Sequence, residues 1–483
     1  MSDFSCNVKE NIKRLETSLN VERNFDILQR EVIIAGRKAG FFFIDGFVRE
    51  DMAEKLMQFF YSLKESDITS LDIFLEKGMP YTEVTRSGNV DYVITQFLSG
   101  VSIMTIDGFD ECLLIDCRTY PMRSVSEQWK DRVLRGSRDG FVETLVSNAA
   151  LLRRRIRDSR FSMEMYTVGE RSRTDVAVCY INDKVDKKLL ERIENLISSI
   201  EVEALTMRKL IQSIDVDALT MNIESLAECM FTHKWINPFP KFKYSERPDT
   251  ATAAILDGNI VIMVDNSPAV MIIPASIFDI IEEADDFNFS PMIGSYLRIT
   301  RFFFSIVTWI LTPLWLLFVN NPDWVPEFMK FVLITDDITV PVLLQLLILE
   351  LAVDGLKLAA VNTPTMLSTP LSIVAGIVVG EYAVSSGWFN PEALLYMAVV
   401  TVGTYGQTNF EMGYAFKFLR VLTLILTQIF NLGGFIAGVV ISVLMIAFNR
   451  TITGKSYIYP LIPWDGKMLK RKVLRVRLPH SYK

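Results

Sequence analysis

Long apolar runs between Arg301 and Asn449 constrain the fold of this chain more than any other feature. A helix that spans a membrane needs about 20 mostly apolar residues. The first run of this kind is Phe302–Val319, with Arg298 just before it. The residues ahead of it mix charged and apolar side chains, as a water-soluble protein does. The sequence therefore predicts a soluble half followed by a membrane half.

The charges around these runs predict an orientation. The loop Asn320–Asp337 carries Asp323, Glu327, Asp336 and Asp337 against Lys330 only. Lysine and arginine mark the cytoplasmic side, so residues 1–301 are predicted to be cytoplasmic and this loop to be outside. The tail is basic and also predicted to be cytoplasmic. Two cytoplasmic ends require an even number of crossings. We expect six, and the alternative is four full spans with a re-entrant segment.

Alternating strand-like and helical patterns predict an α/β fold for the soluble half, in two subdomains. Val32–Ala35 and Gly40–Ile44 read as a hairpin. "YVITQFLSGVSIMTIDGFDECLLIDC" predicts three short strands, and Asp257-Gly258 predicts the turn of another hairpin. The predicted organisation is a flexible polar arm over 1–24, α/β subdomains over 25–130 and 131–297, a polytopic α-helical membrane domain over 298–450, and a basic cytoplasmic tail over 451–483.

Composition excludes several functions. The net charge of −7 gives no general footprint for nucleic acid. Five cysteines without a CxxC pair and two histidines predict no zinc site, no disulfide framework and no cofactor. No nucleophile–base pattern stands out, so we predict that the protein is not an enzyme. The N-terminus lacks the apolar stretch of a signal peptide, and we expect the soluble half to stay in the cytoplasm.

A basic run at Arg153–Arg160 has two interpretations. It could bind phosphate or lipid headgroups, or it could be a solvated helix end or a salt-bridge face between domains. We favour the second interpretation, because isolated basic runs are common.

Three charges interrupt the apolar stretch "LLQLLILELAVDGLK". Glu350, Asp354 and Lys357 share one face of a helix, whereas Gln345 lies on another. Facing lipid would cost at least about 2.5 kcal/mol for each charge, so the stripe must face protein or water. It could line an ion pathway, join a network of ion pairs between helices, or lie at the membrane surface. Glu381, alone in a short apolar run, raises the same question more weakly.

The last part of the membrane half holds three further predictions. Ala415–Phe448 is too long for one simple span and has Asn431 and two glycines near its middle, so it is either two short passes joined by a tight break or one kinked helix. Lys417 and Arg420 predict a cytoplasmic end near its start. The tail is predicted to bind anionic headgroups through four residues, Lys470, Arg471, Lys472 and Arg475.

Several stretches resemble the A-type subunits of the GerA family of bacterial spore germination proteins. These are "VLRGSRDGFVETLVSNAALLRRRIRD", "YTVGERSRTDVAVCYI", "YSERPDTATAAILDGNIVIMVDNSPAVMIIP", "LLILELAVDGLKLAAVNTP" and "PLSIVAGIVVG". The resemblance covers nearly the whole chain after the first 25 residues. "PMIGSY" and "LIPWDGK" favour the stage V sporulation branch of the family over the nutrient receptors, whose usual "SPEDYY" is absent.

The resemblance implies a multi-pass protein of the spore inner membrane that acts in germination. Family members are thought to form ring-shaped, pentameric channels that release monovalent cations. The implied partners are further copies of the chain, a small membrane protein, other germination proteins, cations and membrane lipids. The resemblance also places Glu350, Asp354 and Lys357 in a helix proposed to line the pore. The alternatives are a receptor subunit that binds a small amino acid or sugar, a non-conducting scaffold, and a transporter.

Overall fold

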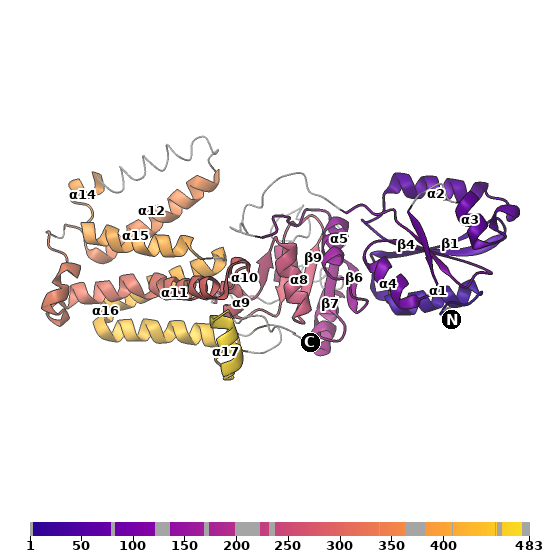
Figure 1. The fold of residues 1–483 in the computed structure, drawn as a ribbon. Helices are drawn as coiled ribbons and strands as arrows, with labels where there is room; N and C mark the ends of the chain where they lie inside the picture. Colours follow the sequence, from indigo (N-terminus) through magenta and orange to yellow (C-terminus); the bar gives the residue numbers. More distant parts are fainter. Residues whose placement is uncertain are drawn as a thin grey trace, which may run out of the picture. The chain divides into compact units, whose positions relative to one another are not determined.

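The computed structural model describes residues 3–78, 83–120, 136–168, 173–198, 223–230, 237–337, 339–362, 382–407, 409–449, 451 and 456–475. They form two compact units (Figure 1). The first unit comprises Met1–His233 and Phe242–Pro274, and the second comprises Lys234–Lys241 and Ala275–Lys483. The first is an α/β unit with two antiparallel sheets, and the second is helical.

The first sheet has the strand order β1-β2-β4-β5-β3, with antiparallel neighbours. Helices cover both faces (Figure 1). The strands are β1 Ile27–Ile34, β2 Arg37–Ile44, β3 Val84–Ser87, β4 Ser102–Ile106 and β5 Cys112–Ile115. Helices α1 (Val8–Leu19) and α4 (Val90–Leu98) pack on one face, and α2 (Glu50–Ser62) and α3 (Leu71–Gly78) pack on the other.

The second sheet repeats this arrangement strand for strand, in the order β6-β7-β9-β10-β8. Its strands are β6 Phe161–Val168, β7 Thr174–Ile181, β8 Lys243–Ser245, β9 Ile260–Val264 and β10 Val270–Ile273. Helices α5 (Leu145–Arg155) and α8 (Pro248–Leu256) pack together on one face of it. The unit also contains a helix over 187–198 and α7 (Ile223–Met230).

The segment predicted as a flexible arm instead forms α1. Val8, Ile12, Leu15 and Leu19 are buried in the core under the first sheet. Their helical spacing creates an apolar face on a segment that is polar overall. The average composition of the segment conceals this face, which is why we predicted an arm.

The predicted hairpin is confirmed by β1 and β2, whereas two other predictions are wrong. The first predicted strand of residues 92–117 is part of α4, whose N-cap residue Asn89 accepts a hydrogen bond from the Tyr92 amide at 2.8 Å. Asp257-Gly258 ends helix α8 and does not turn a hairpin; the turn between β9 and β10 lies near Asn266, where φ is +63°. Short apolar runs fit both a strand and a buried helix, so periodicity could not separate them.

A buried ion pair joins the two sheets inside the first unit. Arg153 of α5 contacts Asp26 through two hydrogen bonds, at 2.7 Å from Nε and 2.8 Å from Nη2. Nη2 also donates to the Asn24 side chain at 2.8 Å, and a β-bridge connects Asn24 to Met163 of β6. Arg153 and Asp26 are fully buried. The salt-bridge interpretation of the basic run is therefore confirmed at Arg153.

Four long helices form most of the described part of the second unit (Figure 1). Helix α15 packs against α11 and α12, and α16 packs against α11. Among the described residues, α11 and α16 are long and apolar enough to cross a membrane. The long helices are α11 (Pro291–Asn320), α12 (Val342–Asn362), α15 (Pro391–Tyr405) and α16 (Phe410–Ala447); the short ones are α9 (Ile277–Ile281), α10 (Asp285–Asn288), α14 (Ala383–Ser385) and α17 (Gly466–Val473).

Helix α16 folds back on itself at Asn431, whose φ of 51° and ψ of −130° are not helical. A Cβ atom placed on Gly438 would lie 2.9 Å from Thr423 Cα. In a straight helix these residues would be about 22 Å apart along the axis. The break predicted from Asn431 and its glycines is confirmed, and the chain reverses there.

Apart from the segment Lys234–Lys241, the helical unit begins at Ala275, ahead of the predicted boundary at 298. Ala275, Ile280 and Ile281 are buried together with Trp309 of α11 and Phe416 of α16. The short helices before the first apolar run therefore pack with the long helices of the second unit.

We predict that Arg153→Ala destabilises the first unit by about 3–5 kcal/mol, because it leaves the Asp26 carboxylate buried without its partner. Hydrogen exchange of β1 and α5 in the full-length protein measures this opening. The control is Arg86→Ala, which breaks an exposed pair with Asp72 at 2.8 Å and should change stability by about 1 kcal/mol or less. Equal effects of the two substitutions would contradict a special role for Arg153.

Candidate functional site

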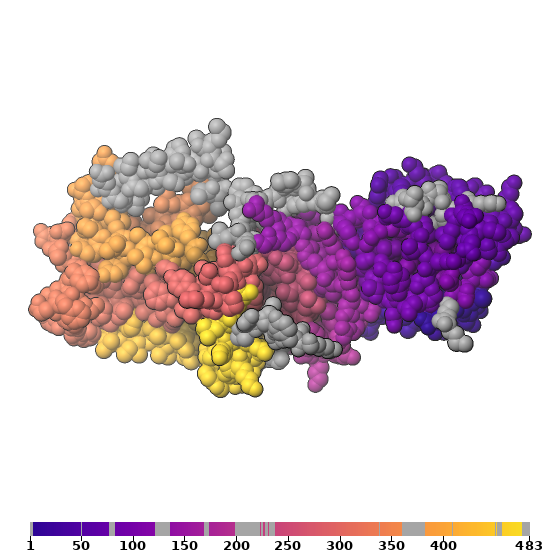
Figure 2. Space-filling view, viewed as in Figure 1, coloured from indigo at the N-terminus to yellow at the C-terminus, as the bar shows by residue number. Residues whose placement is uncertain are grey.

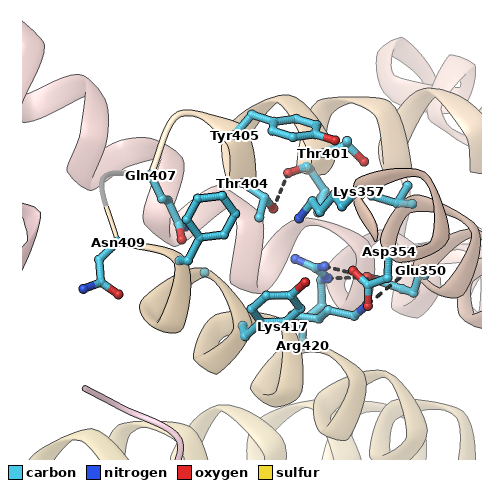
Figure 3. A pocket seen from close by; sticks show the side chains of 15 residues that line it. Glu350, Asp354, Lys357, Thr401, Thr404, Tyr405, Gln407, Asn409, Lys417 and Arg420 are labelled. Carbon is cyan, nitrogen blue, oxygen red and sulfur yellow. Dashed lines mark hydrogen bonds and ion pairs between the residues drawn. The ribbon is translucent and has the colours of Figure 1, made fainter. Parts of the chain in front are cut away.

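The charged stripe lies on the side of α12 that faces α15 and α16 (Figure 3). Glu350, Asp354 and Lys357 line one pocket there with residues of those two helices. Leu344, Leu351 and Leu358, seven residues apart along α12, are exposed at 47%, 74% and 62%. Helix α12 thus has a charged side turned into the bundle and an apolar side turned out of it.

Glu350 is sealed in a two-pronged ion pair with Arg420. Arg420 Nε lies 2.6 Å from Glu350 Oε1, and Nη2 lies 2.8 Å from Oε2. Glu350 and Arg420 are only 4% and 3% exposed. Arg420 Nη1 also donates to the Thr308 carbonyl of α11 at 2.5 Å. One guanidinium therefore ties α11, α12 and α16 together.

Asp354 pairs with Lys417, one turn away from the first pair (Figure 3). Lys417 Nζ also donates to the Glu350 carbonyl at 3.2 Å. We predicted that Lys417 and Arg420 mark a cytoplasmic end, but the structure pairs both with α12. Two basic residues three apart on one apolar helix match two acidic residues four apart on another. That match is the signal in the sequence that could have found the pairs.

Lys357, the third charge of the stripe, contacts two aromatic rings. Among the described residues, no carboxylate lies within ion-pair distance of its ammonium. Nζ instead lies 5.2 Å from the ring centre of Tyr405 and 5.6 Å from that of Tyr414. An aromatic face attracts a cation through its quadrupole. The ammonium is therefore held by the two rings.

The pocket has a volume of about 70 Å³, room for a few water molecules. Thr401, Thr404 and Asn409 add polar groups to its wall (Figure 3). Asp354 Oδ1 and Gln407 Oε1 are buried and accept no hydrogen bond from any described residue. Within the described part of the chain, the pocket therefore combines an ammonium that has no ion pair with two buried oxygens that accept no hydrogen bond, and such groups bind small ions or water.

The depth of these charges follows from their contact with α11. Gln407 Nε2 donates to Thr308 Oγ1 at 3.1 Å, and Arg420 bonds the carbonyl of the same residue. Thr308 lies six residues beyond Phe302, or about 9 Å along the helix axis. The hydrocarbon core of a bilayer is about 30 Å thick. The charges of α12 and α16 thus lie beside the apolar stretch of α11, about 9 Å along the helix axis from its start.

A second polar contact holds α12 against the start of α15. Gln345 Nε2 donates to Asn390 Oδ1 at 2.8 Å, and the backbone N–H of Asn390 donates to Gln345 Oε1 at 2.9 Å. Both residues are buried. Gln345 is not part of the charged stripe, as predicted, but it fixes the same helix from another face. Glu381, the fourth predicted pathway residue, lies outside the described residues.

The four tail residues predicted to bind headgroups fall into two pairs. Lys470 and Arg471 are exposed on α17. Lys472 bonds Asp279 and lies 3.4 Å from Glu282, and the Arg475 guanidinium lies over the Phe287 ring. The second pair thus faces the protein.

Lys472 and Arg475 belong to a contact between α17 and the start of α11, which we call the dock. Arg298 Nη1 donates to the carbonyls of Arg471 and Lys472, at 2.9 and 3.1 Å. Its guanidinium also contacts Asp286 at 3.2 Å and Glu282 at 2.8 Å. Arg298 is 1% exposed and Asp286 is fully buried.

Two opposed effects set the pKa values in this dock. Burial raises the pKa of Asp279, but the Lys472 ammonium and hydrogen bonds from Lys472 and Ser276 outweigh it and hold the pKa below its ordinary value of 3.8. Burial lowers the pKa of Lys472, but Asp279 and Glu282 outweigh it and raise the pKa above 10.5.

The structure combines an α/β unit with a helical unit in which, among the described residues, two helices are long and apolar enough to cross a membrane, and comparison with known proteins identifies the family. The family described as "Bacillus/Clostridium GerA spore germination protein" matches residues 13–213 and 206–483. Stage V sporulation protein AF of Bacillus subtilis (strain 168) is 33% identical over 475 residues, which cover 98% of this chain and 93% of that protein. The protein belongs to the GerA family of spore germination proteins.

A second curated relative agrees with this assignment. Spore germination protein GerLA of Bacillus cereus is 24% identical over 485 residues, covering 98% of this chain and 94% of the relative. The crystal structure of the N-terminal domain of the A subunit of the Bacillus megaterium spore germinant receptor GerK3 is similar at 21% identity, with a TM-score of 0.41; the match covers 56% of this chain and 96% of that chain. The predicted relation to germination proteins is confirmed.

We predict that Arg420→Gln lowers the thermal stability of the purified protein by about 3–5 kcal/mol, because Glu350 then loses its two-pronged partner and keeps only Lys417, 3.7 Å away and shared with Asp354. The double variant Glu350→Gln with Arg420→Gln should recover most of the loss, since it buries no charge at this pair. Lys357→Gln is the matched control, and it should have little effect because Lys357 has no ion-pair partner among the described residues. A double variant as unstable as Arg420→Gln would contradict the pairing.

We predict a pH window for the dock of α17. The lowered pKa of Asp279 makes its contribution complete above about pH 4, and the contribution is lost as the pH falls through the folded-state pKa. The raised pKa of Lys472 keeps its contribution complete below about pH 10.5. The anisotropy of a dye on Lys467→Cys, with Cys6→Ser and Cys229→Ser, should therefore stay high between about pH 4 and pH 10.5 and drop at acid pH. In Asp279→Asn it should be low at neutral pH as well; an unchanged acid transition in that variant would contradict the assignment.

Proposed function

We propose that this protein is a subunit of a homo-oligomeric, pentameric channel in the spore inner membrane that releases monovalent cations and so amplifies germination. In this proposal the protein is multi-pass, and its α/β unit lies on the cytoplasmic, spore-core side. The partners are further copies of the chain, a small membrane protein and other germination proteins. The supporting observation is the polar pocket that α12 forms with α15 and α16 inside an apolar bundle.

Ionisable residues at membrane depth are costly, and they commonly mark the path of an ion. The pocket contains a carboxylate oxygen of Asp354 and an amide oxygen of Gln407 that accept no hydrogen bond from the described residues. Oxygen acceptors and aromatic faces are the groups that replace the hydration shell of a monovalent cation. Repetition of one such pocket around a ring would multiply its few polar groups.

The charged residues of the pocket have different roles in this proposal. Glu350 forms an ion pair with Arg420 and thereby fixes the position of α12. Asp354 supplies the carboxylate that attracts cations. The Lys357 ammonium lies near two aromatic rings, and in this proposal a free cation would bind in a site of the same kind. Glu381 belongs to the same pathway in this proposal, on the argument from the sequence alone.

A non-conducting scaffold is the second candidate. The observation that favours it is the burial of Glu350, which is 4% exposed and forms an ion pair with Arg420. A carboxylate buried in this way holds helices together whether or not ions pass.

Ion flux from proteoliposomes separates the two candidates. We predict that the purified protein releases K⁺, and that Asp354→Asn lowers the flux about tenfold, which corresponds to about 1.4 kcal/mol of lost attraction for the cation. Asp323→Asn, in the exposed loop after α11, makes the same chemical change outside the pocket and should leave the flux unchanged. The same variants, each as the only copy in spores, report K⁺ release during germination.

Two results would overturn the channel. One is equal K⁺ release from wild-type and Asp354→Asn spores at equal protein levels. The other is equal flux from Asp354→Asn and Asp323→Asn liposomes. Normal germination of the Asp354→Asn strain would then favour the scaffold.

A further inference from the structure

The segment 456–475 is held at the level where α11 enters its apolar run. Arg298, which accounts for two of the contacts to α17, lies four residues before Phe302, or about 6 Å along the helix axis. The Arg475 amide adds a hydrogen bond to Ser295 Oγ at 3.0 Å. In a protein whose first span begins near Phe302, these contacts hold α17 at the boundary between water and hydrocarbon. Figure 2 shows this segment in yellow at the surface of the second unit.

Large apolar side chains just before α17 are exposed. Leu461, Ile462 and Trp464 are 41%, 58% and 71% exposed. Three such residues within four positions are unfavourable in water, whereas tryptophan is enriched where a membrane meets water. Asp465 follows them and caps α17, accepting hydrogen bonds from the Lys467 and Met468 amides at 3.1 and 3.0 Å. The apolar residues therefore lead directly into the helix.

Basic side chains follow on the helix itself. Lys467, Lys470 and Arg471 are exposed, and their spacing of three and four residues places them on one face of α17. Lys472 and Arg475 are engaged with the protein. The exposed surface of the segment is thus apolar at one end and cationic along the helix. Apolar and basic groups in this arrangement are typical of segments that lie in the plane of an anionic membrane surface.

We propose that residues 461–471 form an interfacial anchor that binds anionic phospholipid headgroups. Lys467, Lys470 and Arg471 contact the headgroup phosphates, and Trp464, with Leu461 and Ile462, enters the boundary between headgroups and acyl chains. The position of the dock selects a lipid surface over a soluble partner, because the dock holds the segment beside the membrane entry of α11. Charge complementarity selects anionic lipids over zwitterionic ones.

The insertion of Trp464 is tested with the full-length protein in bilayers that contain brominated lipids. Bromine quenches tryptophan on contact, and the difference between wild type and Trp464→Phe isolates the signal of this residue. We expect bromines near the top of the acyl chains to quench it, and more strongly in bilayers with phosphatidylglycerol than in pure phosphatidylcholine. A difference signal that is unquenched in both bilayers would overturn the anchor and leave the surface to a protein partner.

The headgroup contacts are tested by native mass spectrometry of the purified protein with phosphatidylglycerol. The triple variant Lys467→Gln, Lys470→Gln and Arg471→Gln should retain fewer of these lipids than wild type. A variant with the same loss of charge on the exposed residues Lys9, Lys13 and Arg14 of α1 should retain as many as wild type. Equal retention by both triple variants would overturn the proposal. Both measurements are independent of ion flux, so this anchor and the proposed channel can fail separately.

Discussion

The arrangement of the helical unit depends on one electrostatic constraint: a carboxylate buried inside an apolar bundle must be paired with a cation. Glu350 on α12 is matched by Arg420 on α16, whose guanidinium also bonds the Thr308 carbonyl of α11. Removing one partner of such a pair is far more costly than removing both. The pair therefore fixes which side of α12 faces the bundle. Once that side is fixed, Asp354 and Lys357 must lie in the pocket, and Leu351 must lie on the outside.

Buried arginines also pair with carboxylates at two other contacts between segments of the described structure. Arg153 joins the two sheets of the α/β unit through Asp26, and Arg298 joins the start of α11 to α17 and to Asp286. Arg153, Arg298 and Arg420 are all 3% exposed or less. Arginine suits this work because its planar fork makes several directed hydrogen bonds and stays charged when buried. Each of the three connects segments that are far apart in the sequence.

Much of this architecture could be predicted from local patterns. The division into an α/β half and a helical half, the β1–β2 hairpin and the break at Asn431 are each indicated by local sequence patterns. The identity of the charged helix also followed from its sequence, because three charges in an apolar run are conspicuous. The errors arose where local signals were ambiguous. Residues 92–98 are apolar enough for a strand but form α4, and the polar composition of α1 concealed its buried face.

The partners of the charged stripe were beyond local reasoning. Arg420 lies 70 residues from Glu350, and Lys417 lies 63 residues from Asp354. Both basic residues resembled the flank of a membrane span, because lysine and arginine at the end of an apolar run are typical of a cytoplasmic boundary. Only the packing of α16 on α12 distinguishes a buried partner from a flanking charge. The division of the tail into inward and outward basic residues has the same origin, since Lys472 is engaged by acidic residues about 190 positions earlier.

Cysteine accessibility along α12 tests the central claim most directly. Single cysteines at Glu350, Leu351, Asp354 and Lys357, in a chain whose native cysteines are serines, would be exposed to a water-soluble thiol reagent in proteoliposomes. The account predicts fast labelling of Asp354→Cys and Lys357→Cys, because the pocket admits water. It predicts slow labelling of Leu351→Cys on the apolar face and of Glu350→Cys in its sealed contact. Fast labelling at Leu351 together with protection at Asp354 would mean that α12 faces the other way, and would contradict the account.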